Sequence, residues 1–269
     1  MKLGEAIAIL SEAGIENARH DARKIFEHVG KIQKSQLLFS DVECNSPELV
    51  FAVERRRRRE PLQYILGEVN FYRESYKVNE NCLIPRSDTE ILVDYATKNL
   101  PLGCRFIDLC TGSGCVAIST LKNTEKTRAV AVDISQDALG VAIKNAEKNS
   151  VFDRIDFICA DVLDAAAPGK FFAVLANPPY VSESDYANLA PEIYFEPKIA
   201  FVGGMDGLDF YKRIIELYID KIEDCGFFAF EIGFNQAKAL TELAHAYNMR
   251  CEIIKDYSSN DRVAVLRRR

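Results

Sequence analysis

A short polar segment, Asn177-Pro178-Pro179-Tyr180, directly follows an apolar run in the second half of the chain. The Asn177 side-chain oxygen and the Pro178 backbone carbonyl can each accept one hydrogen of a planar NH₂ group, which leaves the nitrogen lone pair facing an incoming methyl group. Proline fixes φ and donates no hydrogen bond, so Pro178 and Pro179 would hold the loop rigid. The Tyr180 ring could lie against a planar acceptor. The segment therefore predicts a site that holds a planar amino group, although Asn and Pro also form ordinary turns.

Further upstream, a predicted strand runs through a glycine-rich turn into a predicted helix, from Phe106 to Ala117. Gly112 and Gly114 permit positive φ and close approach of a ligand, whose charged end would meet the free N–H groups at the helix N-terminus. Asp133 ends the next strand, 21 residues after Gly112, which suits a carboxylate that accepts both hydroxyls of a ribose. The turn therefore predicts a nucleoside-containing ligand, unless the glycines serve only a tight turn.

The identity of that ligand is open on the glycines alone, because their spacing also fits the dinucleotide fingerprint of a nicotinamide enzyme. Asp108 favours a different cofactor. A carboxylate at the end of the first strand would repel a pyrophosphate, but it suits the cationic amino-acid portion of S-adenosyl-L-methionine (SAM). Asp161, just after the third strand, is placed to contact the adenine amine, with Val162 as an apolar wall; a loop acid that caps a turn is the alternative for Asp161.

Composition limits the classes of partner. The chain has 269 residues, 48% of them hydrophobic, with 34 Lys and Arg against 40 Asp and Glu, for a net charge of −6. These values are typical of a folded globular protein. Non-specific binding to nucleic acid depends on Lys and Arg that neutralise phosphates, so the acidic balance disfavours DNA as the partner.

The cysteines and the N-terminus bear on metal content and location. The eight cysteines include no C-x-x-C pair and only three histidines are present, so we expect no metal site. Several cysteines lie in apolar stretches, and Cys159 is expected to be a buried thiol. Glu5 precedes any long apolar run, and no stretch reaches about 18 uncharged apolar residues. We therefore expect a reducing, cytoplasmic location, with neither secretion nor a membrane span.

The elements that position these residues fall into two groups. Over about 70 N-terminal residues, apolar side chains recur at helical spacing, with breaks at Gly14, Gly30 and Ser46-Pro47. Ser46 followed by Pro47 predicts a capped helix start, and this helix should run into Glu54–Glu60 and stop at Pro61. From Tyr64 to Leu83 the period shifts toward two, which predicts a hairpin or extended connector. We place the domain boundary at residue 72.

Beyond Thr89, strand and helix patterns alternate. This order predicts an α/β fold with a mostly parallel, doubly wound sheet that is covered by helices on both faces. The predicted helices are Glu90–Leu100, Gly114–Leu121, Ala138–Lys148, Leu208–Ile222 and Gln236–Tyr247. The predicted strands are Arg105–Leu109, Arg128–Asp133, Ile155–Ala160, Phe171–Ala176, Phe227–Ile232 and Arg250–Ile254.

Together, Asp108–Gly114, Asp133 and Asn177–Tyr180 resemble the class I SAM-dependent methyltransferases that modify planar amino groups. That family shares the Asn-Pro-Pro-Tyr loop between DNA adenine methyltransferases and protein glutamine methyltransferases. Further segments across nearly the whole chain resemble the release-factor glutamine methyltransferases, the PrmC/HemK family. They are Arg57–Gly67, Phe71, Leu83–Glu90, Glu196-Pro197, Gly203–Leu208, Lys255-Asp256 and Asp261-Arg262.

The resemblance implies a fold, an activity and a set of site residues. The fold is a Rossmann-like class I methyltransferase sheet, mostly parallel with one antiparallel strand near the edge. Residues 1–72 would be a helical substrate-recognition domain with the start of a hairpin linker, and residues 73–269 the SAM-dependent methyltransferase domain. The activity is methyl transfer to the glutamine side-chain nitrogen in the Gly-Gly-Gln motif of peptide-chain release factors. The implied catalytic and substrate-binding residues are Asn177, Pro178, Pro179 and Tyr180, and the implied SAM contacts are Asp108, Cys110, Thr111, Gly112, Ser113, Gly114, Asp133, Asp161, Val162 and Asn177.

The sequence departs from the family pattern at three positions. Cys110 replaces the usual glycine in the turn, Ser87 replaces the usual proline after Pro85-Arg86, and Ser259 stands where the C-terminal segment often has glycine. None of these changes removes a proposed catalytic group. They bear only on local geometry, above all on the width of the turn beside SAM at Cys110.

Two other functions stay open on the sequence. DNA adenine methylation would need a target-recognition domain and a basic cleft, for which the run Arg55–Arg59 is the best argument. Five successive arginines point around most of a helix, so several must be solvated or paired with neighbours such as Glu54 and Glu60. The alternative to such a solvated helix face is that the run contacts an acidic release factor or RNA. A non-catalytic SAM-binding module is the other possibility.

Overall fold

The computed structural model describes residues 1–38 and 42–269. They form two compact units, one of residues 1–69 with 190–195 and the other of residues 70–189 with 196–269. Each unit has its own core of buried apolar side chains. Among the described residues, no helix has the length and apolar character needed to cross a membrane. The inclusion of residues 190–195 in the first unit had no signal in the sequence.

The first unit is helical, as the apolar spacing predicts, and its helices pack around Leu10, Phe26 and Leu49. Ser46 caps the third helix, since its hydroxyl accepts from the Leu49 N–H at 3.4 Å and proline fills the first turn. The helical segments are α1 (Leu3–Glu12), α2 (Ala18–His28), η1 (Gln36–Leu38), α3 (Pro47–Arg57), α4 (Leu62–Leu66) and η4 (Pro191–Phe195).

Two predicted boundaries in this region are wrong. Helix α3 ends at Arg57, before the predicted stop at Pro61, because the chain leaves helical geometry and Arg59 takes a left-handed φ of 72°. The extended segment predicted from Tyr64 begins only after α4, which ends where Gly67 adopts a φ of 75°. A helix of five residues is too short to show helical periodicity in sequence.

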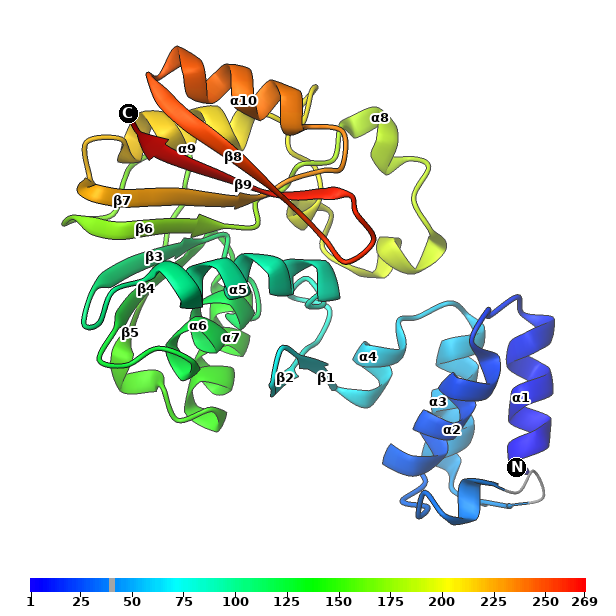
Figure 1. The fold of residues 1–269 in the computed structure, drawn as a ribbon. Coiled ribbons are helices and arrows are strands. Elements are labelled where there is room, and N and C mark those ends of the chain that lie inside the picture. Colours follow the sequence, from blue (N-terminus) through cyan, green and yellow to red (C-terminus); the bar gives the residue numbers. More distant parts are fainter. Residues whose placement is uncertain (39–41) are drawn as a thin grey trace. The chain divides into compact units, whose positions relative to one another are not determined.

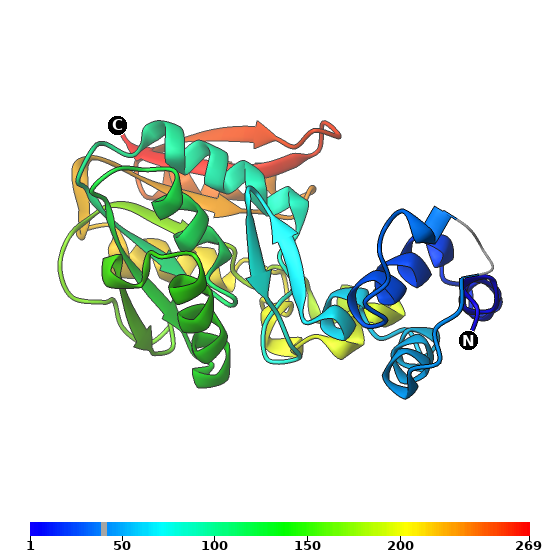
Figure 2. The ribbon, with the colours of Figure 1, turned by 90° about the horizontal axis from the view of Figure 1, so that it is seen from below.

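A hairpin follows, with strands β1 (Glu68–Phe71) and β2 (Glu74–Lys77) side by side in a two-stranded sheet (Figure 2). Its Tyr76 side chain is fully buried, and the hydroxyl lies 2.5 Å from the Ser119 Oγ. The predicted hairpin is therefore confirmed, and Tyr76 anchors it to the core of the second unit.

The second unit is built on a seven-stranded sheet with the order β5-β4-β3-β6-β7-β9-β8. Neighbouring strands from β5 to β7 are parallel, whereas β9 is antiparallel to both β7 and β8. The prediction of one antiparallel strand near the edge is therefore confirmed. The strands are β3 (Arg105–Leu109), β4 (Arg128–Asp133), β5 (Ile155–Cys159), β6 (Phe171–Ala176), β7 (Ile222–Glu231), β8 (Met249–Lys255) and β9 (Asp261–Arg268).

Helices cover both faces of this sheet, with α5, α6 and α7 on one face and α9 and α10 on the other (Figure 1). The predicted helix 208–222 is too long, because Ile222 already belongs to β7, and β9 is absent from the segments predicted individually. The helical segments are η2 (Ser87–Thr89), α5 (Glu90–Asn99), α6 (Cys115–Lys122), α7 (Gln136–Lys148), η3 (Phe152–Arg154), α8 (Glu183–Tyr186), η5 (Lys198–Ala200), α9 (Asp209–Tyr218) and α10 (Ala237–Ala246).

The thiols of this fold are all free. The prediction that Cys159 is buried is wrong: it is exposed at the end of β5, an edge strand of the sheet. An edge strand lacks a neighbour on one side, so even apolar residues at its end keep contact with solvent.

The strand order places the proposed site residues together at the carboxyl ends of neighbouring parallel strands. Strand β3 lies between β4 and β6, so the order reverses there, and open α/β sheets bind ligands in the crevice at such a switch point, outside the carboxyl ends of the strands. The glycine-rich turn follows β3, Asp133 ends β4, and Asn177 follows β6. The alternating pattern thus brings together residues that are far apart in sequence.

Candidate active site

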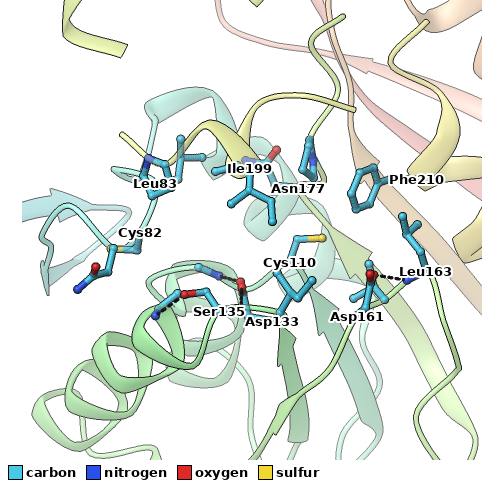
Figure 3. Close-up of a pocket in the computed structure, with 18 residues that line it drawn as sticks. Cys82, Leu83, Cys110, Asp133, Ser135, Asp161, Leu163, Asn177, Ile199 and Phe210 are labelled. Atoms are coloured by element: carbon cyan, nitrogen blue, oxygen red, sulfur yellow. Dashed lines mark hydrogen bonds between the residues drawn. The ribbon is translucent and has the colours of Figure 1, made fainter. Parts of the chain in front are cut away.

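A cavity lies at the carboxyl ends of the parallel strands (Figure 3). Asn177, Ile199 and Phe210 lie along one side, and Cys110 and Asp133 face them from the other. The predicted site residues that line the cavity are Cys110, Gly112, Asp133, Asp161, Val162, Asn177 and Pro179. The sequence therefore identified the polar floor of the cavity and one part of its opposite wall.

A smaller pocket adjoins this cavity and shares Cys110, Gly112 and Asn177 with it. Thr111 and Ser113 of the turn line the smaller pocket, together with Thr89. The Ser113 hydroxyl is buried, and no described residue forms a hydrogen bond with it. Buried polar atoms without a partner are rare in native structures, so this hydroxyl is a candidate contact for a polar ligand group.

The backbone of the turn explains the residue types that it carries. Gly112 has a φ of 53° and a Cβ there would meet nothing within 4 Å, so a ligand can approach the main chain closely. Gly114 has a φ of 81°, and a Cβ there would lie 2.9 Å from the Ile118 Cδ1. Glycine is therefore needed at Gly112 for φ and at Gly114 for both φ and helix packing.

Cys110 also takes a left-handed conformation, with a φ of 60°. A side chain costs about 1–2 kcal/mol in this region, which explains why a glycine suits the position. The Cys110 side chain points its sulfur toward the cavity (Figure 3). Burial, together with the nearby Asp133 and Asp108, raises the pKa of its thiol well above the usual range. Cys110 is therefore a neutral, space-filling group beside the ligand position.

Asp133 is held by the main chain on both of its oxygens. The Gly112 N–H donates to Oδ2 at 2.8 Å and the Ser135 N–H donates to Oδ1 at 3.0 Å. Burial raises its pKa, and these hydrogen bonds partly offset that effect. Each carboxylate oxygen has a second lone pair, so Asp133 can still accept from a ligand in the cavity.

Asp161 makes the turn-capping contact given as its alternative interpretation and also lies at the cavity, while its contact with the adenine stays a prediction. Its Oδ1 accepts from the Leu163 N–H at 2.8 Å, which is the turn-capping contact, and the residue also lines the cavity beside Val162. The turn therefore fixes an acid at the cavity wall (Figure 3).

Asp108 is only 1% exposed and is absent from the lining of both pockets. Its Oδ2 accepts from the Thr111 hydroxyl at 2.5 Å and from the Ala117 N–H at 3.2 Å. Burial raises its pKa to about 7. Asp108 thus links the glycine-rich turn to the first turn of α6 through hydrogen bonds. Its proposed contact with SAM stays a prediction.

The Asn177–Tyr180 segment leaves β6 and is packed from behind. Its Asn177 Nδ2 donates to the Thr89 Oγ1 at 3.3 Å, and no described residue donates to the Asn177 Oδ1. The Tyr180 hydroxyl points inward and donates to the Glu231 Oε1 at 3.3 Å. Pro178 and Tyr180 do not line the cavity, so the stacking role predicted for the tyrosine ring stays a prediction.

Glycines of a later loop keep the backbone of this segment in place. A Cβ on Gly203 would lie 2.1 Å from the Pro179 carbonyl oxygen, and one on Gly207 would lie 2.2 Å from the Tyr180 carbonyl oxygen. The Gln236 Nε2 also donates to the Tyr180 carbonyl at 3.2 Å. These contacts account for the glycine pattern that contributes to the family resemblance.

Other lining residues were missed as individual site residues because they share no chemical pattern. They come from segments 81–83, 134–135, 163 and 197–200 and from the starts of α7 and α9, and most are apolar or small. Glu196, quoted only as part of the resemblance, joins two of these loops: its Oε2 accepts from the Ile84 N–H at 2.9 Å and its Oε1 pairs with Arg86. The missed lining residues are Asn81, Cys82, Leu83, Ile134, Ser135, Ala138, Leu163, Pro197, Ile199, Ala200 and Phe210.

Comparison with known proteins places this architecture in a family. The family profile "Methyltransferase small domain" matches residues 87–196, and the profile "PrmC N-terminal domain" matches residues 3–67. A release factor glutamine methyltransferase of Thermodesulfovibrio yellowstonii is 38% identical over 258 residues, which cover 92% of each chain. One of Fusobacterium nucleatum is 34% identical over 98% of this chain and 77% of its own length.

A solved structure supports the fold alone. The ribosomal protein L11 methylase of Lactobacillus delbrueckii subsp. bulgaricus matches with a TM-score of 0.53 and 18% identity, over 71% of this chain and 84% of its own. The chain belongs to the family of release factor glutamine methyltransferases.

Proposed function

We propose that this protein transfers a methyl group from SAM to the side-chain nitrogen of the glutamine in the Gly-Gly-Gln motif of peptide-chain release factors. The observation that carries the proposal is the position of Asn177, which lines both pockets and keeps its Oδ1 free of described donors. The names of the curated relatives support the same activity.

The residues present fit SAM. The larger cavity has a carboxylate at Asp133 for the ribose hydroxyls and an acid at Asp161 beside the apolar Val162 for the adenine. The smaller pocket offers the unpartnered Ser113 hydroxyl, next to Thr111, for the amino-acid end. The methyl group would then lie where the two pockets meet, beside Asn177. Bound SAM would supply the methyl on a sulfonium, which is a good leaving group.

The loop residues would orient and stabilise the acceptor. An amide nitrogen is a poor nucleophile because its lone pair is delocalised into the carbonyl. The Asn177 Oδ1 and the Pro178 carbonyl would accept the two hydrogens of the glutamine NH₂ and hold its nitrogen in line with the methyl group. Their dipoles would also stabilise the positive charge that develops on this nitrogen. The nitrogen would lose one of its hydrogens as a proton to water, and the cofactor would leave as the neutral thioether S-adenosylhomocysteine, so no carboxylate base is required in the loop.

Replacement of Asn177 tests this assignment. Asn177→Ala should lower turnover about 100-fold, the loss expected for one preorganised polar contact to a developing charge. SAM affinity should change little, because the other pocket residues remain. Transfer from labelled SAM to purified release factor and equilibrium binding of SAM are the measurements, with the exposed Asn99→Ala as control. Unchanged turnover in Asn177→Ala would remove the assignment.

We also propose that the helical first unit docks the release factor, because the loop can read little beyond one glutamine and specificity needs a further surface. The DNA alternative is disfavoured because each arginine of the run Arg55–Arg59 has a carboxylate partner within the first unit. A cytoplasmic location is proposed with this function, since release factors act in translation and the thiols are free.

A further inference from the structure

The buried side-chain amide of Gln236 holds the downstream end of the Asn177–Tyr180 segment. Gln236 directly precedes α10 and is 7% exposed. Its Nε2 donates to the Tyr180 carbonyl and to the Gly207 carbonyl, each at 3.2 Å. Its Oε1 accepts from the Gly233 N–H at 2.9 Å. One side chain thus connects the segment to two other loops.

The chemistry of these partners fixes the direction of the Gln236 amide. Carbonyl oxygens only accept and a main-chain N–H only donates, so the NH₂ group must face Tyr180 and Gly207, and the oxygen must face Gly233. The Tyr211 hydroxyl also lies on the oxygen side, 3.4 Å from Oε1. A reversed amide would set its oxygen against two carbonyl oxygens and its NH₂ against a donor. Both hydrogens of the NH₂ group are used in the orientation that the structure shows.

The main chain around this amide leaves it little freedom. The Gln236 N–H donates to the Gly233 carbonyl at 2.9 Å, and the Gln236 carbonyl accepts from the Leu240 N–H of α10 at 3.0 Å. Gly207 has a φ of 71°, and a Cβ there would lie 2.8 Å from the Gln236 Nε2. The close approach of the Gly207 and Tyr180 main chains to the amide therefore requires glycine at this position.

The position of the Tyr180 carbonyl bears on the acceptor site because few bonds between them can rotate. Asn177 directly follows β6, and the two prolines after it have a fixed φ. Downstream, Val181 pairs with segment 201–203 through two main-chain hydrogen bonds. The segment is held at both ends, so a displacement of Tyr180 would be passed on to the prolines.

We propose that Gln236 is a positioning residue for methyl transfer: by holding the Tyr180 carbonyl, it fixes the direction in which the Pro178 carbonyl meets the glutamine NH₂. Gln236 and Tyr180 are absent from the described lining of both pockets, so Gln236 acts through the segment and not by contact with SAM. A displacement of about 1 Å in a group that orients the reactants can cost about 100-fold in rate. This inference rests on the proposed methyl transfer at Asn177.

The test uses the full-length protein and a change of similar size at Gln236. Gln236→Met removes both donations and should lower kcat for the release factor about tenfold, the effect of roughly one hydrogen bond. The SAM Kd should stay within about twofold of the wild-type value, because the pocket residues remain. Binding stoichiometry with SAM gives the fraction of folded protein, to which kcat is normalised.

Asn149→Leu is the matched control. The Asn149 amide is also buried, and its Nδ2 donates to two carbonyls, that of Asn145 at 2.9 Å and that of Ser75 at 3.4 Å. These partners belong to α7 and the hairpin and not to the Asn177–Tyr180 segment. Asn149→Leu should therefore lower the free energy of unfolding to a similar extent in urea and keep full kcat.

A second variant covers the case in which Gln236→Met does not fold. Gln236→Asn keeps an amide but is shorter by one methylene, so its NH₂ no longer spans to the Tyr180 carbonyl, and kcat should again fall at unchanged SAM Kd. The proposal is overturned if either folded variant keeps wild-type kcat, if Asn149→Leu loses as much kcat, or if the loss appears in the SAM Kd instead. It is also overturned if neither variant folds, since Gln236 would then serve stability alone. Absence of methyl transfer by the wild-type protein would remove the proposed function, and this inference with it.

Discussion

Asp133 and Asp161, which we propose bind the nucleoside part of SAM, are each held by main-chain N–H groups. Gly112 and Ser135 donate to Asp133, and Leu163 donates to Asp161. Main-chain donors in tight turns cannot swing away as side chains can. The acids are therefore in place before a ligand arrives, which reduces the cost of ordering them on binding.

The buried Glu231 makes the stability of the protein depend on pH. Burial raises its pKa from 4.5 to about 7, so folding favours the neutral form. Its stabilising contribution is complete below the unfolded value and is lost as the pH rises through about 7. Between about pH 5 and pH 8, the free energy of unfolding of the wild type should fall relative to Glu231→Gln by on the order of 2–3 kcal/mol.

Urea unfolding of both proteins at a series of pH values measures this difference. Asp108 has a similarly raised pKa and is present in both proteins, so its contribution cancels. A difference between the two proteins that stays constant over this pH range would show that Glu231 titrates normally.

At the scale of single residues, the sequence predicted which residue types lie at the site better than it predicted what each side chain contacts. Asp133 and Asn177 line the cavity as predicted, because acids and amides after buried strands lie at the carboxyl edge. Thr89 could not be found in this way, since its hydrogen bond with Asn177 arises from a meeting of η2 with the loop after β6. Asp108 illustrates a second difficulty. Its position near the end of β3 was clear from the sequence, but the sequence does not give the direction of its side chain, which decides whether it faces a ligand or the turn.

At the scale of elements, Asn145 of α7 connects the hairpin to the glycine-rich turn. Its Oδ1 accepts from the Lys77 N–H at 2.7 Å, and its Nδ2 donates to the Lys77 carbonyl at 3.0 Å and to the Ser113 carbonyl at 2.9 Å. The side chain is fully buried. One amide thus satisfies backbone groups of both the hairpin and the glycine-rich turn.

Asn145→Ala should therefore lower the free energy of unfolding by about 3 kcal/mol, because buried backbone groups lose their partners. SAM binding should weaken as well, since the turn at Ser113 is released. Chemical denaturation and equilibrium SAM binding are the measurements. The exposed Asn99→Ala should cost less than about 0.5 kcal/mol, and an equal cost for the two changes would contradict the role given to Asn145.

The arginine run Arg55–Arg59, which begins in the last turn of α3, contains residues with very different surroundings. The Arg56 side chain is 10% exposed and its Nε lies 2.8 Å from the Asp21 Oδ2, whereas the Arg58 side chain is 72% exposed beside Glu54. Removing one partner of a buried pair costs about 3–5 kcal/mol, and an exposed pair contributes about 0–1 kcal/mol. Arg56→Ala should thus destabilise the helical unit far more than Arg58→Ala in urea unfolding followed by circular dichroism. Similar losses would show that the run acts as one solvated face.

One physical reason explains why some strands were predicted with accurate ends. Strands β3, β4 and β6 match their predicted ranges to the residue, because strands covered on both faces read as continuous apolar runs between polar ends. Strand β9 was missed since charges interrupt it at both ends, Asp261-Arg262 and Arg267-Arg268. It follows β8 in a hairpin, a partner that only the assembled sheet supplies.

For the whole molecule, the net charge of −6 has a clearer meaning. The five arginines of the strongest basic segment, Arg55–Arg59, pair with four carboxylates of their own unit. Most of the charge of this run is therefore offset, which weakens its attraction for phosphates. This pairing supports our proposal of a protein substrate rather than a nucleic acid.

Deletion of residues 1–70 tests the docking role proposed for the helical unit. The described cavity-lining residues begin at Asn81, so the truncated protein should still bind SAM, and this binding is the control for folding. Methylation of an intact release factor should fall much more than that of a short peptide with the Gly-Gly-Gln motif. Equal losses on the two substrates would contradict docking by this unit.

The central claim is methyl transfer to one glutamine nitrogen, and mass spectrometry tests it most directly. The full-length protein is incubated with SAM and a purified release factor, and the modified residue is located by fragmentation. We predict one added methyl group on the glutamine of the Gly-Gly-Gln motif, and none with Asn177→Ala. A methyl group on another residue, or transfer to DNA adenine without modification of the factor, would contradict the account.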